Sequence, residues 1–127
     1  MRLTFLAPLL LLSLPAAAFT AQNGMTAVQT APSEITVIHD VKRGDTDYWC
    51  AAGDFAQRAM GLPGNTRLWR ASPKPRRAGD GIVFTLDASK AAPDAGLSQF
   101  GSGPQDGSIP LSMAVGSYCR IIVPFFD

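Results

Sequence analysis

Short apolar runs that are rich in β-branched and aromatic residues recur along the chain, and runs of this kind are typical of β-strands. They span residues 35–39, 66–72, 81–86, 109–115 and 118–123. Pro124 comes directly after the last run. Proline cannot donate a hydrogen bond to the ladder, so its position indicates a strand end or an edge strand. Together these runs predict four or five strands.

A different period governs residues 47–60, where proline is absent and alanine is frequent. Apolar residues recur there at intervals of four, three and four: Tyr48, Ala52, Phe55 and Ala59. This spacing places them on one face of an amphipathic helix. Gly61 then supplies a residue that suits a helix C-terminus, and Pro63 cannot continue a helix.

One helix and four or five strands predict an α+β fold. The helix, at about 47–60, is expected to pack on one face of a small, mainly antiparallel sheet that a disulfide closes. Residues 19–33 are small and polar, so we expect a flexible lead-in there, with a short strand at 26–30 as the alternative. A single globular domain is expected at 34–127.

The first residues of the chain, 1–18, have the three parts of a cleavable signal peptide. A single charge at Arg2 precedes an apolar run at 3–14, and three alanines that end at Ala18 supply the small residues of a cleavage site. A transmembrane anchor, the alternative, needs about 20 apolar residues, and this run is shorter and contains Pro8. We therefore expect an exported protein, periplasmic or secreted, with no membrane span once the signal is removed.

The charge balance bears on the class of partner. The whole chain carries a formal net charge of +1, and loss of Arg2 with the signal would leave the mature chain close to neutral. A neutral protein has no long-range field that attracts a polyanion, so we expect no nucleic acid as a partner.

The chain has two cysteines, Cys50 and Cys119. In an oxidising compartment such a pair is expected to form a disulfide, worth about 4 kcal/mol because the loop that it closes is long. On a helical wheel, however, Cys50 lies opposite the apolar face, beside Asp54 and Gln57. Two explanations stay open: the first helical turn is distorted, or a sheet element, the C-terminal strand, covers that side.

Few residues are candidates for catalysis. A free Cys50 in the first turn of the helix would have a lowered thiol pKa and could act as a nucleophile. His39 is the only histidine, and its neighbour Asp40 would point to the opposite face of a strand. One histidine and a bonded cysteine pair supply no zinc set, and no motif indicates a cofactor. An exported enzyme that uses Cys50 or His39 is therefore only the alternative to a non-catalytic protein.

Basic and aromatic residues gather around the connection between residues 66–72 and 81–86, where they would lie along one strand and at the tip of a hairpin. The candidates for contact with an anionic ligand or partner are Arg67, Trp69, Arg70, Lys74, Arg76 and Arg77. The alternative is a solvated loop whose charges maintain solubility. Residues 87–110, rich in Gly, Pro, Ser and Asp, predict a second long loop with one helical turn near Ser89.

These observations favour a non-catalytic module that binds another component of the cell envelope. No motif identifies the partner, which we expect to be an envelope protein or an anionic ligand. An anion- or glycan-binding module that uses the basic loop, and the enzyme described above, are the alternatives.

Overall fold

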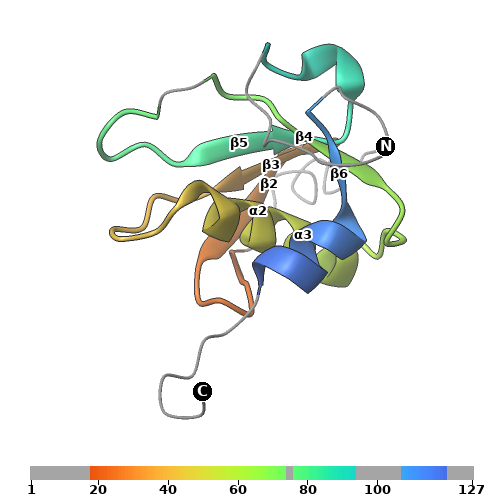
Figure 1. Cartoon of the computed structure of the whole chain (residues 1–127), viewed down its shortest axis with the longest axis horizontal. Helices are drawn as coiled ribbons and strands as arrows, with labels where there is room; N and C mark the ends of the chain where they lie inside the picture. The colour runs from red at the N-terminus through yellow and green to blue at the C-terminus, as the bar shows by residue number, and fades with distance from the viewer. Residues whose placement is uncertain (1–17, 74–75, 94–106, 120–127) are drawn as a thin grey trace, which may run out of the picture.

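The computed structural model describes residues 18–73, 76–93 and 107–119. Within them, six antiparallel strands form one curled sheet in the order β1-β2-β3-β5-β4-β6 (Figure 1). The strands are β1 (Phe19–Thr20), β2 (Thr26–Ala31), β3 (Glu34–Val37), β4 (Arg67–Arg70), β5 (Ile82–Thr85) and β6 (Ile109–Pro110). The α+β class is therefore confirmed, while the described sheet has six strands rather than four or five. Residues 1–17 of the predicted signal peptide lie outside the described residues.

Two α-helices belong to the described part of the chain, α2 (Asp45–Asp54) and α3 (Leu111–Tyr118). α2 continues into a π-helical turn, η1 (Phe55–Ala59), so the predicted helix is present but is not the only one. A 3₁₀ turn, η2 (Ala88–Lys90), lies where a helical turn was predicted near Ser89. None of these helices has the length and apolar content that a membrane crossing requires.

One face of the sheet forms the core, because alternate side chains of a strand point to the same side. In β3, Ile35 and Val37 are buried, whereas Glu34 and Thr36, which alternate with them, are partly exposed. The buried residues that the other strands add on this face include Ala27, Leu68, Ile82 and Phe84. Trp49 of α2 packs edge-to-face on Phe84, with ring centroids 4.8 Å apart, so α2 covers this face.

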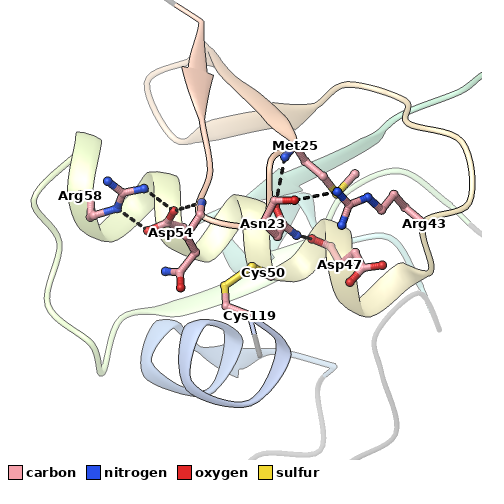
Figure 2. Close-up of a disulfide and its surroundings, with 9 residues drawn as sticks. Asn23, Met25, Arg43, Asp47, Cys50, Asp54, Arg58 and Cys119 are labelled. Carbon is pink, nitrogen blue, oxygen red and sulfur yellow. Dashed lines mark hydrogen bonds and ion pairs between the residues drawn. A yellow bond between two sulfur atoms is a disulfide. The ribbon is translucent and has the colours of Figure 1, made fainter. Parts of the chain in front are cut away.

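From Tyr48 onward α2 is buried on every side, which departs from the amphipathic helix that the sequence predicts. All of residues 48–56 are buried. The sheet covers one side, the turn between β1 and β2 covers a second side at Asp54, and α3 covers a third side (Figure 2). Small residues allow this close packing: a Cβ atom on Gly53 would lie 2.7 Å from the Cβ atom of Ala114 in α3.

The predicted disulfide joins Cys50 of α2 to Cys119, the residue that follows α3 (Figure 2). The side of α2 that appears polar on a helical wheel is therefore covered by a C-terminal element, but that element is a helix and not the predicted strand. Both cysteines of the chain are bonded, so neither is a free thiol. A disulfide of this kind indicates an oxidising, non-cytoplasmic environment.

The strands predicted at 109–115 and 118–123 are wrong within the described residues. Only the two residues of β6 belong to the sheet there, and α3 follows directly. Residues 120–127, which include most of the second predicted strand, lie outside the described residues. The apolar side chains that α3 turns toward the core recur at helical intervals of three and four: Leu111, Ala114 and Tyr118.

In the segment 19–33, β2 confirms the short strand expected at 26–30, whereas the flexible lead-in expected before it is part of the sheet as β1 and a turn. Gly24 closes the turn between these strands with a positive φ of 88°. The Asn23 side chain donates from Nδ2 to the backbone oxygen of Asp47 at 3.0 Å, which fastens the turn to α2 (Figure 2). The small polar residues are thus those that a tight turn requires, and the folded region reaches back to β1.

We expect the disulfide to supply a large part of the stability. It links residues 69 apart in sequence, and a loop of that length is worth about 4 kcal/mol in the chain-entropy model. The double variant Cys50→Ala/Cys119→Ala should lose about that much free energy of unfolding, measured by denaturation in guanidinium chloride. Dithiothreitol should destabilise the wild type and leave the double variant unchanged. An unaltered unfolding midpoint after verified reduction would contradict the prediction.

Two helical glycines should respond to alanine with opposite signs. Gly53→Ala places a methyl group against Ala114 and should cost about 1–3 kcal/mol, because the two helices must separate. Gly116→Ala, in α3, has no atom within 4 Å of the new methyl group and should gain about 0.5–1 kcal/mol from helix propensity. Thermal denaturation of the two variants checks both signs, and equal effects would show that the helices are not packed this closely.

Candidate functional site

The predicted contact residues of β4 are engaged within the protein. The Arg67 side chain reaches Ser108, with Nε donating to Oγ and Nη2 donating to the backbone oxygen, each at 3.0 Å. Trp69 is partly buried in β4, where it lies opposite Thr85 of β5. Arg67 therefore ties β4 to the segment before β6, and Lys74, the next basic candidate after Arg70, lies outside the described residues.

Arg70 is a buried arginine, with 2 % of its surface exposed. Its Nη1 lies 3.2 Å from Asp45 Oδ2 at the start of α2, and this pair balances its charge. Nε donates to the backbone oxygen of Ser72 at 2.8 Å, and Nη2 donates to that of Pro73 at 3.4 Å. Arg70 therefore holds the beginning of the connection between β4 and β5 against α2.

Arg76, later in the same connection, has a different environment. Its guanidinium carbon lies 4.6 Å from the centre of the Tyr48 ring, a cation–π arrangement. Nη1 lies 3.4 Å from His39 Nδ1 and donates to the Asp80 backbone oxygen at 3.2 Å. Nη2 donates to the Arg43 backbone oxygen at 3.5 Å. Arg76 thus bridges residues 38–43 and 76–81, two loops on the same side of the molecule (Figure 1).

The hydrogen bonds of Arg76 are long, and none of its acceptors is a carboxylate. No described carboxylate forms an ion pair with it, in contrast to Arg43, Arg58 and Arg70. Its Nε is buried and has no hydrogen-bond partner among the described residues. A buried donor without an acceptor costs about 1–3 kcal/mol of free energy. An acceptor that a ligand supplies to the Arg76 guanidinium would therefore be stabilising.

A cavity of about 240 Å³ opens beside these arginines. Its lining residues come from the connection between β4 and β5: Arg70, Ser72, Pro73, Arg76, Arg77, Asp80 and Gly81. Asp80 is the acidic residue of the lining, and Asp45 compensates Arg70 from outside it. With Arg70 compensated, Arg76 and Arg77 stand against Asp80 alone, so the lining keeps an excess of one positive charge. We call it the arginine pocket.

The structure gives the enzyme alternative little support. Cys50 is in the disulfide, so it provides no thiolate. Asp40 does not orient His39, because its carboxylate pairs with Arg43 at 3.2 Å and its backbone N–H donates to the Tyr48 hydroxyl at 3.1 Å. Across the described ranges, no three His, Cys, Asp or Glu side chains come together in a way that could hold a metal ion.

The residues that complete the arginine pocket carry no signal that sequence reasoning could have used. Tyr48 looked like an ordinary core residue, and in the structure one ring face carries Arg76. Ser72 and Asp80 have the character of loop residues, and they line the pocket because residues 72–73 and 76–81 come together there. Their positions depend on contacts between segments that are far apart in sequence.

A second charged cluster, at the other end of α2, is structural, because its carboxylate is buried and paired. Asp54 is 1 % exposed, and its carboxylate accepts two bonds of 2.6 Å from Arg58 and one of 2.8 Å from the Gln22 backbone N–H (Figure 2). Burial alone would raise the pKa of Asp54, but the hydrogen bonds from Arg58 and Gln22 outweigh burial and hold the pKa below 3.8. The spacing of four between Asp54 and Arg58 could have predicted this pair.

No protein-family model, no curated protein and no solved structure matches this chain. The arginine pocket is therefore characterised by its own residues, and it is the one cluster described above that combines an opening with a guanidinium, that of Arg76, which forms no ion pair within the described residues.

Asp54→Asn should destabilise the protein at neutral pH by about 1–2 kcal/mol, because the ionised carboxylate is the better acceptor for Arg58 and Gln22. A carboxyl whose pKa is lower in the folded state stabilises the fold above its unfolded pKa. This contribution disappears as the pH falls through the folded pKa, below 3.8. The difference in unfolding free energy between wild type and variant should therefore shrink from about pH 5 downward. A constant difference down to about pH 2.5 would show that the charge of Asp54 does not matter.

Proposed function

We propose that this protein is an exported, non-catalytic binding module and that the arginine pocket receives an anionic group of its partner. The observation that carries the proposal is the state of Arg76, a half-buried guanidinium at a cavity with no carboxylate partner among the described residues. Export is supported by the signal-like sequence at 1–18 and by the oxidising environment that the disulfide indicates.

The buried Arg70 and the half-buried Arg76 have different roles in the pocket. Arg70 already has a carboxylate partner in Asp45, so it supports the pocket wall. Arg76 bonds to two backbone oxygens and one imidazole nitrogen at 3.2–3.5 Å, all weaker partners than a carboxylate. An incoming carboxylate would therefore compete well for Arg76, since the guanidinium fork matches the two oxygens of a carboxylate.

The contacts around Arg76 prepare it for this role. Stacking on Tyr48 holds the plane of the guanidinium, and the bonds to the loops at 38–43 and 76–81 limit its motion. A side chain that is already positioned loses less conformational entropy when it binds. The alternative, a loop that is charged only for solubility, does not require Arg76 to lie over the Tyr48 ring.

Titration with glutarate, a small dicarboxylate, tests the proposal on the mature protein at constant ionic strength. Binding should raise the melting temperature and shift the NMR resonance of Arg76 Nε–H. Arg76→Gln should weaken binding at least about tenfold, since a charge-assisted hydrogen bond is worth about 1.5–3 kcal/mol.

Lys90→Gln is the matched control, because it removes a positive charge from the exposed turn η2, outside the pocket lining. It should leave glutarate binding unchanged. Glutarate that does not bind, or that binds Arg76→Gln and wild type equally well, would refute the anionic site. Circular dichroism of each variant shows whether the fold is retained.

A further inference from the structure

His39, the only histidine of the chain, lies on the same face of the sheet as the arginine pocket. Strand alternation puts its side chain on the side of the buried Val37, which is the face that α2 covers. The Ile38 backbone N–H still donates to the Thr26 oxygen at 2.9 Å, so the strand pairing continues beyond β3 to this point. His39 is half-buried, so its imidazole keeps access to solvent protons.

His39 touches residues of the pocket lining. Its Nδ1 lies 3.4 Å from Nη1 of Arg76, whose guanidinium forms no ion pair in the part of the chain that the structure describes. Gly81, another lining residue, runs against the His39 main chain, since a Cβ atom on Gly81 would lie 3.2 Å from the His39 backbone nitrogen. His39 is therefore a neighbour of the cavity, although it is not itself one of the lining residues.

The contact with Arg76 fixes where the proton of His39 lies. A guanidinium donates hydrogen bonds and cannot accept one, so the contact requires a lone pair on His39 Nδ1. The imidazole is then neutral, with its proton on Nε2. Protonation of Nδ1 removes this acceptor and places a second positive charge beside the guanidinium. The bond between His39 and Arg76 therefore exists only while the imidazole is neutral.

Protonation of His39 changes what Arg76 offers to a ligand. Nη1 of Arg76 has two N–H groups, and they face His39 Nδ1 and the Asp80 backbone oxygen. Loss of the imidazole lone pair leaves one of these N–H groups without its acceptor. The new N–H on His39 Nδ1 points toward the same place, because it occupies the position of the lone pair. An anion is the group that accepts from both donors and balances both charges.

The surrounding elements give His39 no carboxylate of its own. Asp40 pairs with Arg43 at 3.2 Å, and Asp80 reaches Arg76 through its backbone oxygen. No ion pair joins His39 to a carboxylate within residues 18–73, 76–93 and 107–119. Asp45 is paired with Arg70. The titratable and charged groups that α2 and the two loops also carry are Lys42, Asp45, Asp47, Tyr48, Arg70 and Arg77.

We infer that His39 is a second anion-binding residue of the arginine pocket and that its protonation strengthens anion binding at Arg76. The neutral imidazole competes with a ligand for an N–H of Arg76, whereas the imidazolium attracts the ligand and donates to it. Affinity for an anion therefore rises as the pH falls through the range in which imidazoles titrate, about pH 8 to 5. This inference rests on the proposed function and adds regulation by pH to its site.

An imidazole that only positions Arg76 would give the opposite sign. Protonation would then remove a positioning bond, and anion binding would weaken at low pH. That bond is long, at 3.4 Å, so little is lost with it. The attraction between an imidazolium and an anion a few ångströms away is larger, because a partly buried site screens charges less than water does. The sign of the pH dependence thus separates the two roles.

Titration of the mature protein with sulfate tests the inference at about pH 8 and about pH 5.5, at constant ionic strength. Sulfate keeps its charge across this range, so a change in affinity reports on the protein. Wild type should bind sulfate at least about fivefold more tightly at the lower pH. His39→Gln keeps a side-chain acceptor for Arg76 but has no group that titrates there, so its affinity should be the same at both pH values.

Asp80→Asn is the matched control, because it removes the acidic side chain of the lining. It should bind sulfate more tightly at both pH values and keep the ratio between them. NMR of the His39 ring gives an independent measurement: sulfate should favour the protonated imidazole in wild type and not in Arg76→Gln, since the coupling of two binding events is reciprocal. Circular dichroism at both pH values shows that each variant is folded.

The outcomes separate this inference from the proposed function. Sulfate binding that depends on Arg76 but is equal at both pH values, or that keeps its pH ratio in His39→Gln, would overturn the inference and leave the proposed function standing. Weaker binding at the lower pH would reduce His39 to a positioning residue and would also overturn it. An absence of Arg76-dependent binding at both pH values would refute the inference and the anionic site together.

Discussion

The disulfide between Cys50 and Cys119 is the constraint on which the arrangement of the helices depends. It ties the end of α3 to the middle of α2, on the side of α2 that the sheet does not cover. Once α3 is held there, Gly53 and Ala114 can pack closely, and α2 is buried on all sides from Tyr48 onward. A chain of this size buries only a modest core, so a covalent link that restricts the unfolded state contributes a large fraction of the net stability.

A fixed α2 in turn supports both loops of the proposed binding surface. Asp45 at its start anchors Arg70, and Tyr48 one turn later carries Arg76 on its ring and holds Asp40 through its hydroxyl. Two arginines six residues apart in one connection therefore have different roles. The one with a carboxylate partner is structural, and the one without is available to a ligand. Positive charge alone, which both share, does not distinguish them.

The correct predictions from sequence concern elements whose pattern is local. β3, β4 and β5 were expected from runs of β-branched and aromatic residues, and α2 with η1 was expected from apolar residues at helical spacing. The errors arose where composition was ambiguous. Residues 19–33 looked flexible because a tight hairpin turn and a flexible segment use the same small polar residues. Residues 111–115 and Tyr118 fall in predicted strands, although Leu111, Ala114 and Tyr118 recur with a helical period.

By itself the sequence determined the α+β class, the cysteine pair and the set of basic residues from which the pocket is built. It could do so because hydrophobic period, cysteine number and charge are properties of neighbouring residues or of composition. Only the tertiary structure decided that α3 covers Cys50, that Arg67 and Arg70 are engaged internally, and that Arg76 reaches back to Tyr48 and His39. These outcomes depend on which segments meet after folding. Several of the acceptors are backbone oxygens, which every residue type has, so the sequence does not reveal which residue supplies them.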